Sequence, residues 1–212
     1  MRARIVQAVL AVSLLVALDA CTESPTVTRL PEGTVSTPAA QPTVETTADL
    51  TALKKRAGIP DCPESDGSVP ALSGGLPDVM VPCLGGGRDV RLAGLRGKPM
   101  LINLWAQWCG PCRDEAPYLS EVARHNQSNL MIVGVNFHDP YPDLAIEFAQ
   151  QAGWRYPQLQ DADAGFSRLQ VIAPPVTVFV RADGSIAGWH RSSFTSTAQV
   201  KSLVKQNLGI TL

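Results

Sequence analysis

The sequence predicts an α/β fold in which helices flank a mixed central sheet. From residue 100 onward, apolar runs of strand length alternate with segments whose apolar residues recur at helical spacing. The dipeptide Asp183-Gly184 then separates two apolar segments, a pattern typical of a β-hairpin. The resulting order, β-α-β-α-β-β-α, is typical of a mixed sheet covered by helices.

The first half of this pattern begins with a short strand expected at Asp89–Leu92. Met100–Trp105 is an apolar run interrupted only by Asn103, and it predicts a buried strand. From 112 to 126 the apolar residues follow helical spacing. Leu130–Phe137 is a second apolar run, which predicts the next strand.

The second half is bounded by residues that start or stop helices. Pro142 opens a helix that Gly153 should end. The predicted hairpin strands are 176–181 and 185–189. A last apolar stripe, beginning at Val200, predicts a helix that stops at Gly209.

The amino-terminal residues 1–20 have the pattern of an export signal peptide. Arg2 and Arg4 precede the apolar run Ile5–Leu18, which is shorter than the roughly 20 residues that span a bilayer. The residues before Cys21 resemble a bacterial lipobox, in which that cysteine carries lipid, although Asp19 departs from the pattern. The alternative is an uncleaved anchor with no role for Cys21. Both place the remaining chain outside the cytoplasm, at the outer face of the cytoplasmic membrane.

The rest of the chain divides into three parts. Residues 21–47 are rich in Thr and Pro and predict a disordered tether. Residues 48–87 predict an extension that starts with a short helix ending at Gly58 and continues as an irregular, Gly- and Pro-rich segment. Residues 88–212 form the α/β domain. A formal net charge of −1 and a pI near 6.3 give no reason to expect a nucleic-acid partner.

The sequence Trp108-Cys109-Gly110-Pro111-Cys112 lies where a predicted strand meets a predicted helix. Disulfide exchange needs one thiolate that attacks and a second thiol that resolves the mixed disulfide. A cysteine at a helix N-terminus has a lowered pKa, so Cys109 is the expected nucleophile and Cys112 the resolving thiol. A CxxC pair can also be half of a zinc site, but the chain has no second CxxC, so no metal and no cofactor are expected.

These residues resemble the thioredoxin superfamily, and within it the TlpA/ResA-like membrane-anchored oxidoreductases of bacteria. The resemblance covers about residues 88–212 and rests on WCGPC with Pro117 in the following helix, and on Pro174-Pro175 before an apolar strand. It implies a thioredoxin fold in which Pro175 is a cis residue that faces the cysteines. The other residues that it implies as supports of the site are Trp108, Gly110, Pro111, Asn103, Pro117 and Pro174.

The resemblance also shows a departure from thioredoxin itself. Asn103 stands where cytoplasmic thioredoxins carry a buried Asp that assists proton transfer, and an amide cannot take that proton. Some TlpA/ResA-like proteins supply an acid after the next strand, where this chain has Asp139. Asp139 is therefore the candidate for tuning the two thiols. The alternative is that Asp139 only caps the following helix.

Cys62 and Cys83 are left over once the other cysteines are assigned. In an oxidising compartment such a pair most simply forms a structural disulfide. The alternative is a second redox pair that relays electrons to Cys109.

The predicted function is that of an extracytoplasmic thiol–disulfide oxidoreductase. The resemblance favours a reductase of exported protein thiols, as in cytochrome c maturation, supplied with electrons by a membrane protein. Two alternatives stay open: an oxidant that forms disulfides in exported proteins, and a lipoprotein adaptor without catalysis.

Overall fold

A computed structural model describes residues 46–125, 128–162 and 165–212. The predicted signal peptide, Cys21 and nearly all of the predicted tether lie outside the described residues. The described residues belong to one compact unit. No helix in these ranges is long and apolar enough to cross a membrane.

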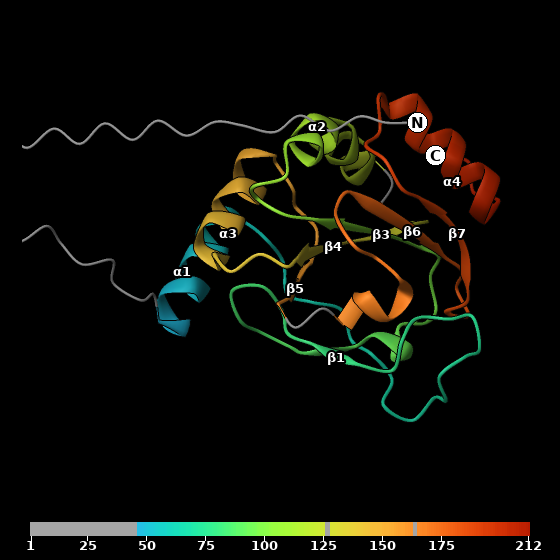
Figure 1. Ribbon diagram of the computed structural model, residues 1–212, viewed down its shortest axis with the longest axis horizontal. Coiled ribbons are helices and arrows are strands. Elements are labelled where there is room, and N and C mark those ends of the chain that lie inside the picture. Colours follow the sequence, from blue (N-terminus) through green and yellow to red (C-terminus); the bar gives the residue numbers. More distant parts are fainter. Residues whose placement is uncertain (1–45, 126–127, 163–164) are drawn as a thin grey trace, which may run out of the picture. The chain divides into compact units, whose positions relative to one another are not determined.

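The central sheet has five strands in the order β5-β4-β3-β6-β7 (Figure 1). β3 lies in the middle, parallel to β4 and antiparallel to β6. β5 is parallel to β4, and β7 completes the predicted hairpin with β6. The mixed sheet is thus confirmed, and its strands are β3 (Met100–Trp105), β4 (Met131–Phe137), β5 (Gln158–Asp161), β6 (Val176–Val180) and β7 (Ile186–His190).

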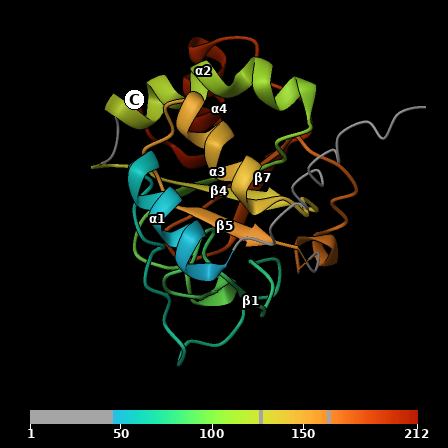
Figure 2. The ribbon, with the colours of Figure 1, turned by 90° about the vertical axis from the view of Figure 1, so that its left-hand side faces the viewer.

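Side chains alternate along β3 between two separate cores. Leu101 and Trp105 join a core to which all four described helices contribute. Figures 1 and 2 show α2 and α4 side by side over the sheet and α1 beside α3. The helices are α1 (Thr47–Ala57), α2 (Gly110–His125), α3 (Pro142–Gln151) and α4 (Thr197–Leu208).

The opposite face of the sheet is covered mainly by the part of the amino-terminal extension that follows α1. Ile102 and Leu104 of β3 pack there with Val81 and Val90, which belong to a small antiparallel ribbon. The ribbon consists of β1 (Met80–Val81) and β2 (Val90–Arg91), and short 3-10 turns at Leu92–Gly94 and Gly165–Leu169 complete this layer. The strand expected at 89–92 is therefore shorter than predicted, because the chain turns at Leu92.

The helix ends follow the predicted stop signals. Gly58 and Gly209 cap α1 and α4 in the left-handed conformation, with φ of 67° and 72°, which glycine adopts without strain. The first helix begins at Thr47, one residue before the predicted start of the extension, because Thr46 and Asp49 form a reciprocal capping box.

The strand β5 was missed because its sequence, Gln-Leu-Gln-Asp, carries no apolar run. Gln158 is nevertheless fully buried. Its side-chain amide accepts a hydrogen bond from Trp105 Nε1 at 3.0 Å and donates to the Tyr156 carbonyl at 3.2 Å. The amide lies over Gly134 of β4, where any Cβ would overlap the Gln158 side chain. In β5, hydrogen bonds between buried polar groups therefore take the place of the apolar side chains by which a buried strand is predicted from sequence.

Candidate active site

Cys109 and Cys112 form a disulfide at the junction of β3 and α2, with their Cα atoms 5.3 Å apart. Cys109 directly precedes Gly110, the first residue of α2, and its Sγ accepts a hydrogen bond from the Cys112 N–H at 3.2 Å. Cys109 is 4% exposed and Cys112 is fully buried. Because free N–H groups at a helix start stabilise a thiolate, the two sulfur atoms are electrostatically unequal.

Three residues near the cysteine pair in sequence lie just before α2 or within it. Trp108 is 53% exposed beside the disulfide. Pro111 lies in the first turn of α2, where a missing N–H costs no helical hydrogen bond. Pro117 lies inside the helix and removes one such bond there.

The loop that leads into Cys109 is held by the buried carboxylate of Asp139. Its Oδ2 accepts hydrogen bonds from the Gln107 N–H at 2.8 Å and from Asn136 Nδ2 at 2.9 Å. Its Oδ1 accepts from the Tyr141 N–H at 3.2 Å, directly before α3. Asp139 thus ties the turn that precedes α3 to the active-site loop. Its bond to Tyr141 lies before the helix, which has no side-chain capping hydrogen bond among the described residues.

A second buried carboxyl group, which sequence reasoning missed, is Glu115. It is fully buried and accepts hydrogen bonds from Asn103 Nδ2 at 2.8 Å and from the Phe194 N–H at 3.0 Å. Burial raises the pKa of Glu115 to about 7, although both hydrogen bonds act in the opposite direction. Glu115 is therefore a group that can take or give a proton near neutral pH.

The helical spacing of α2 contains the signal that would have found Glu115. Cys112, Glu115, Ala116 and Leu119 follow the i, i+3, i+4, i+7 pattern, so the carboxyl group lies on the buried face with the resolving cysteine. A glutamate on an apolar stripe is an anomaly that predicts a special environment.

The Pro174–Pro175 peptide bond is cis and leads into β6. Leu104 pairs with Val176, so this bond lies next to the end of β3, where the cysteine loop begins. Thr177, two residues further along, accepts a hydrogen bond from Asn103 Nδ2 at 3.4 Å. The fold thus brings the proline loop and the cysteine loop to one end of the sheet.

Large apolar side chains are exposed on the loops at this end of the sheet. Trp108 precedes Cys109, Ile172 precedes the proline pair and is 93% exposed, and Tyr141 begins the turn into α3 at 55% exposure. Exposed apolar groups around a reactive centre are typical of a surface that binds another protein.

Cys62 and Cys83 form a second disulfide, with Cα atoms 5.8 Å apart, on the face covered by the extension. Together with Asp61 they present ligand atoms within 4.8 Å of one another. The disulfide uses both sulfur atoms, and the Lys54 ammonium lies 3.0 Å from Cys83 Sγ, so this set is poorly suited to a cation.

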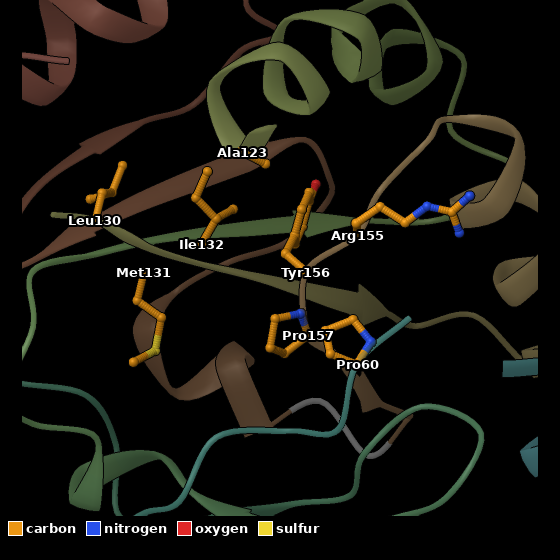
Figure 3. A pocket seen from close by; sticks show the side chains of 8 residues that line it. All are labelled: Pro60, Ala123, Leu130, Met131, Ile132, Arg155, Tyr156 and Pro157. Carbon is orange, nitrogen blue, oxygen red and sulfur yellow. The ribbon is translucent and has the colours of Figure 1, made fainter. Parts of the chain in front are cut away.

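A pocket of about 280 Å³ lies away from the cysteines, at the amino ends of β4 and β5 (Figure 3). Its walls include Ala123, Ile132 and Tyr156. The Tyr156 hydroxyl is buried and has no hydrogen-bond partner among the described residues. The pocket is mainly apolar, and none of the predicted site residues lines it.

Residues 74–188, more than half of the chain, match the AhpC/TSA family model. The chain belongs to the AhpC/TSA family. The match spans β3, α2 and the proline loop, so it includes Cys109, Cys112 and Pro175.

Curated relatives of this AhpC/TSA protein carry the names of thiol–disulfide enzymes. It is 34% identical to "Thiol:disulfide interchange protein DsbE" of Pseudomonas fluorescens biotype C over 115 residues, 52% of this chain and 61% of that protein. It is 31% identical to "Thiol-disulfide oxidoreductase ResA" of Oceanobacillus iheyensis over 99 residues, 46% of this chain and 51% of that protein. The chain thus spans only about half to three fifths of the length of these relatives.

Solved structures resemble this AhpC/TSA protein over most of their own length. MTB dsbF, solved in mixed oxidized and reduced forms, has 28% identity and a TM-score of 0.56, covering 66% of this chain and 98% of that chain. A secreted Mycobacterium tuberculosis disulfide oxidoreductase homologous to E. coli DsbE has 28% identity and a TM-score of 0.54, covering 61% and 96%. The thioredoxin fold is therefore established, and it is extended at the amino end.

Proposed function

We propose that the chain is an extracytoplasmic thiol–disulfide oxidoreductase that exchanges disulfides through Cys109 and Cys112. The single observation that carries this proposal is the bond between the two sulfur atoms at the start of α2, with the Cys112 N–H directed at Cys109 Sγ. The names of the relatives support the same chemistry. The proposed direction is reduction of disulfides in exported proteins, which keeps their thiols reduced, as for those used in cytochrome c maturation.

In the reducing direction the Cys109 thiolate attacks one sulfur of a substrate disulfide. The second substrate sulfur leaves as a thiolate and takes a proton from water. Cys112 then loses its proton and attacks Cys109 Sγ, which releases the first substrate sulfur. The substrate has gained two electrons, and Cys109 and Cys112 end as the disulfide.

The resolving step needs a proton acceptor, because Cys112 is fully buried. Glu115 lies one helical turn further along the same face of α2, and its pKa of about 7 leaves a substantial ionised fraction near neutral pH. Asn103 holds the carboxyl group from the β3 side through its 2.8 Å hydrogen bond. We assign proton transfer at Cys112 to Glu115 and placement of the Cys109 loop to Asp139.

The partners follow from the same proposal. Exported proteins with thiols or disulfides would contact the apolar surface around Trp108 and Ile172. A membrane protein would supply electrons by reducing the Cys109–Cys112 bond. Lipid at Cys21, or an uncleaved anchor, would hold the chain at the outer face of the cytoplasmic membrane.

Two measurements test the proposal. The reduced protein should reduce insulin, and Cys112→Ala should abolish turnover while trapping mixed disulfides with its partners. A reduction potential near that of thioredoxin, roughly −270 mV, would support the reducing direction, whereas one near −120 mV would show an oxidant. Failure to reduce or oxidise any disulfide would leave a binding adaptor as the function.

A further inference from the structure

The second disulfide lies against a buried lysine. Lys54 in α1 is 6% exposed, and its ammonium group donates a hydrogen bond to Cys83 Sγ at 3.0 Å. The same group donates to the Gly86 carbonyl at 2.7 Å, which fixes its position beside the sulfur. A disulfide that served only as a crosslink would not require a buried cation at one of its atoms.

The cation does more for a thiolate than for a disulfide. A neutral bonded sulfur is a weak acceptor, whereas a thiolate facing an ammonium group forms a charge-assisted hydrogen bond. Asp61 Oδ1 lies 3.7 Å from Cys83 Sγ and 3.7 Å from the Lys54 ammonium group, so its charge opposes this effect. The Asp61 side chain is 56% exposed, and water screens its charge. Lys54 has the shorter contact and the drier surroundings, so its contribution is the larger.

The two sulfur atoms have different surroundings. Cys62 Sγ lies 3.2 Å from the Gln158 carbonyl oxygen, which would disfavour negative charge on that atom. Cys83 Sγ lies 3.7 Å from the same oxygen and is the sulfur that faces Lys54. Of the two, Cys83 is therefore the better leaving group when the bond is attacked.

We propose that Cys62–Cys83 is a second redox site, a reducible disulfide whose Cys83 thiolate is stabilised by Lys54, and that it takes electrons from a dithiol. The bond also closes the loop from Cys62 to Cys83 within the extension while it is oxidised. This site is separate from the proposed chemistry at Cys109 and can be tested without it.

The electron transfer balances with a dithiol as the reductant. One reductant thiolate attacks Cys62 Sγ, the bond to Cys83 breaks, and its electron pair stays on Cys83, facing Lys54. The second reductant thiol loses its proton and attacks the mixed disulfide, which releases Cys62 as a thiolate that takes a proton. The reductant ends as a disulfide, and the two cysteines have gained two electrons.

The test is a redox equilibrium in the full chain carrying Cys109→Ser and Cys112→Ser. Mixtures of reduced and oxidised dithiothreitol set the redox potential of the solution, and equilibrium is approached from both the reduced and the oxidised protein. Alkylation with mass mapping then gives the reduced fraction of Cys62 and Cys83. In this background Lys54→Met should raise the ratio of reduced to oxidised dithiothreitol at half-reduction about tenfold, equivalent to one pKa unit of lost thiolate stabilisation.

Two further variants separate electrostatics from damage to the fold. Lys55→Met removes the same charge from the next residue, which makes no hydrogen bond or ion pair among the described residues, and should leave the ratio unchanged. Asp61→Asn removes the opposing charge and should lower the ratio severalfold. A variant that only loosened the fold would make the bond easier to reduce, which is the opposite sign from that predicted for Lys54→Met. An unchanged or lowered ratio in Lys54→Met, or shifts of the same sign at Lys54 and Asp61, would overturn the proposal.

Discussion

Asn103 Nδ2 donates a 2.8 Å hydrogen bond to the carboxyl group of Glu115, and both side chains are fully buried. The contact joins β3 to α2 just behind the resolving cysteine. The amide of Asn103 cannot accept or release a proton, but the carboxyl group that it holds can. The buried acid on the Cys112 side of this site therefore comes from the helix, while the strand supplies the group that orients it.

Glu115→Gln should make the stability of the oxidised protein less dependent on pH. The pKa of Glu115 is about 7 in the folded protein and near 4.5 when exposed, so the unfolded chain loses this proton first as pH rises. Protonated Glu115 should therefore contribute its full share to the free energy of unfolding of the wild-type protein below pH 4.5. Nearly all of that share, roughly 3 kcal/mol, should be lost by pH 7. Denaturant unfolding of both proteins at several pH values would show the difference, and parallel pH profiles would contradict it.

Cys109 should be the more reactive thiol of the reduced pair, with a pKa below the roughly 8.5 of a free cysteine. The helix start and the Cys112 N–H both favour its thiolate. Alkylation rates measured across pH, with each adduct located by mass mapping, would check this. Equal rates for Cys109 and Cys112 would remove the assignment of the nucleophile.

Asp139→Asn should lower the pKa of the Cys109 thiol, because it removes a negative charge from the group that holds the Cys109 loop. Asn keeps one oxygen to accept the Gln107 N–H, so the loop should stay in place. Asp143→Asn is the matched control, since Asp143 lies in the first turn of α3 and its side chain makes no hydrogen bond within the part of the chain that the structure describes. A thiol titration that is the same in both variants would leave Asp139 as an anchor of the two loops only.

Pro174→Thr should increase mixed-disulfide formation with unrelated extended peptides. In thioredoxin-fold enzymes the residue before the cis-proline pairs with the substrate backbone, and Pro174 has no N–H to donate. Restoring one donor is worth about 1 kcal/mol, or a few-fold in affinity. Ala173→Thr introduces the same side chain one position earlier without adding a donor. Trapping yields in a Cys112→Ala background that do not differ between the two variants would show that the donor does not limit substrate choice.

Much of the fold could be predicted because its signals are local. The apolar run of β3, the Asp183-Gly184 turn and the stops at Gly58 and Gly209 each act within a few residues. β5 escaped because Gln158 is buried through a hydrogen bond to Trp105, 53 residues away in sequence.

The site, like the fold, could be predicted only where its signals are local in sequence. WCGPC and the proline pair are short motifs, and the structure brings them to one end of the sheet. The partners of Asp139 and Glu115 are distant in sequence: the Gln107 N–H for one and the Phe194 N–H for the other. Local reasoning treats an acidic residue in a helix as solvated, so only the apolar spacing around Glu115 could have revealed it.

The position of the Gln158 amide over Gly134 restricts which sequences this fold can accept. Any side chain at that position must displace the Gln158 amide, which would leave the Trp105 indole N–H without its acceptor in the helical core. The carbonyl oxygen of the same Gln158 lies 3.2 Å from Cys62 Sγ on the other side of the sheet. The absence of a side chain at Gly134 therefore makes room for a residue that contacts both halves of the interior: its side chain lies in the helical core and its backbone contacts the Cys62–Cys83 disulfide.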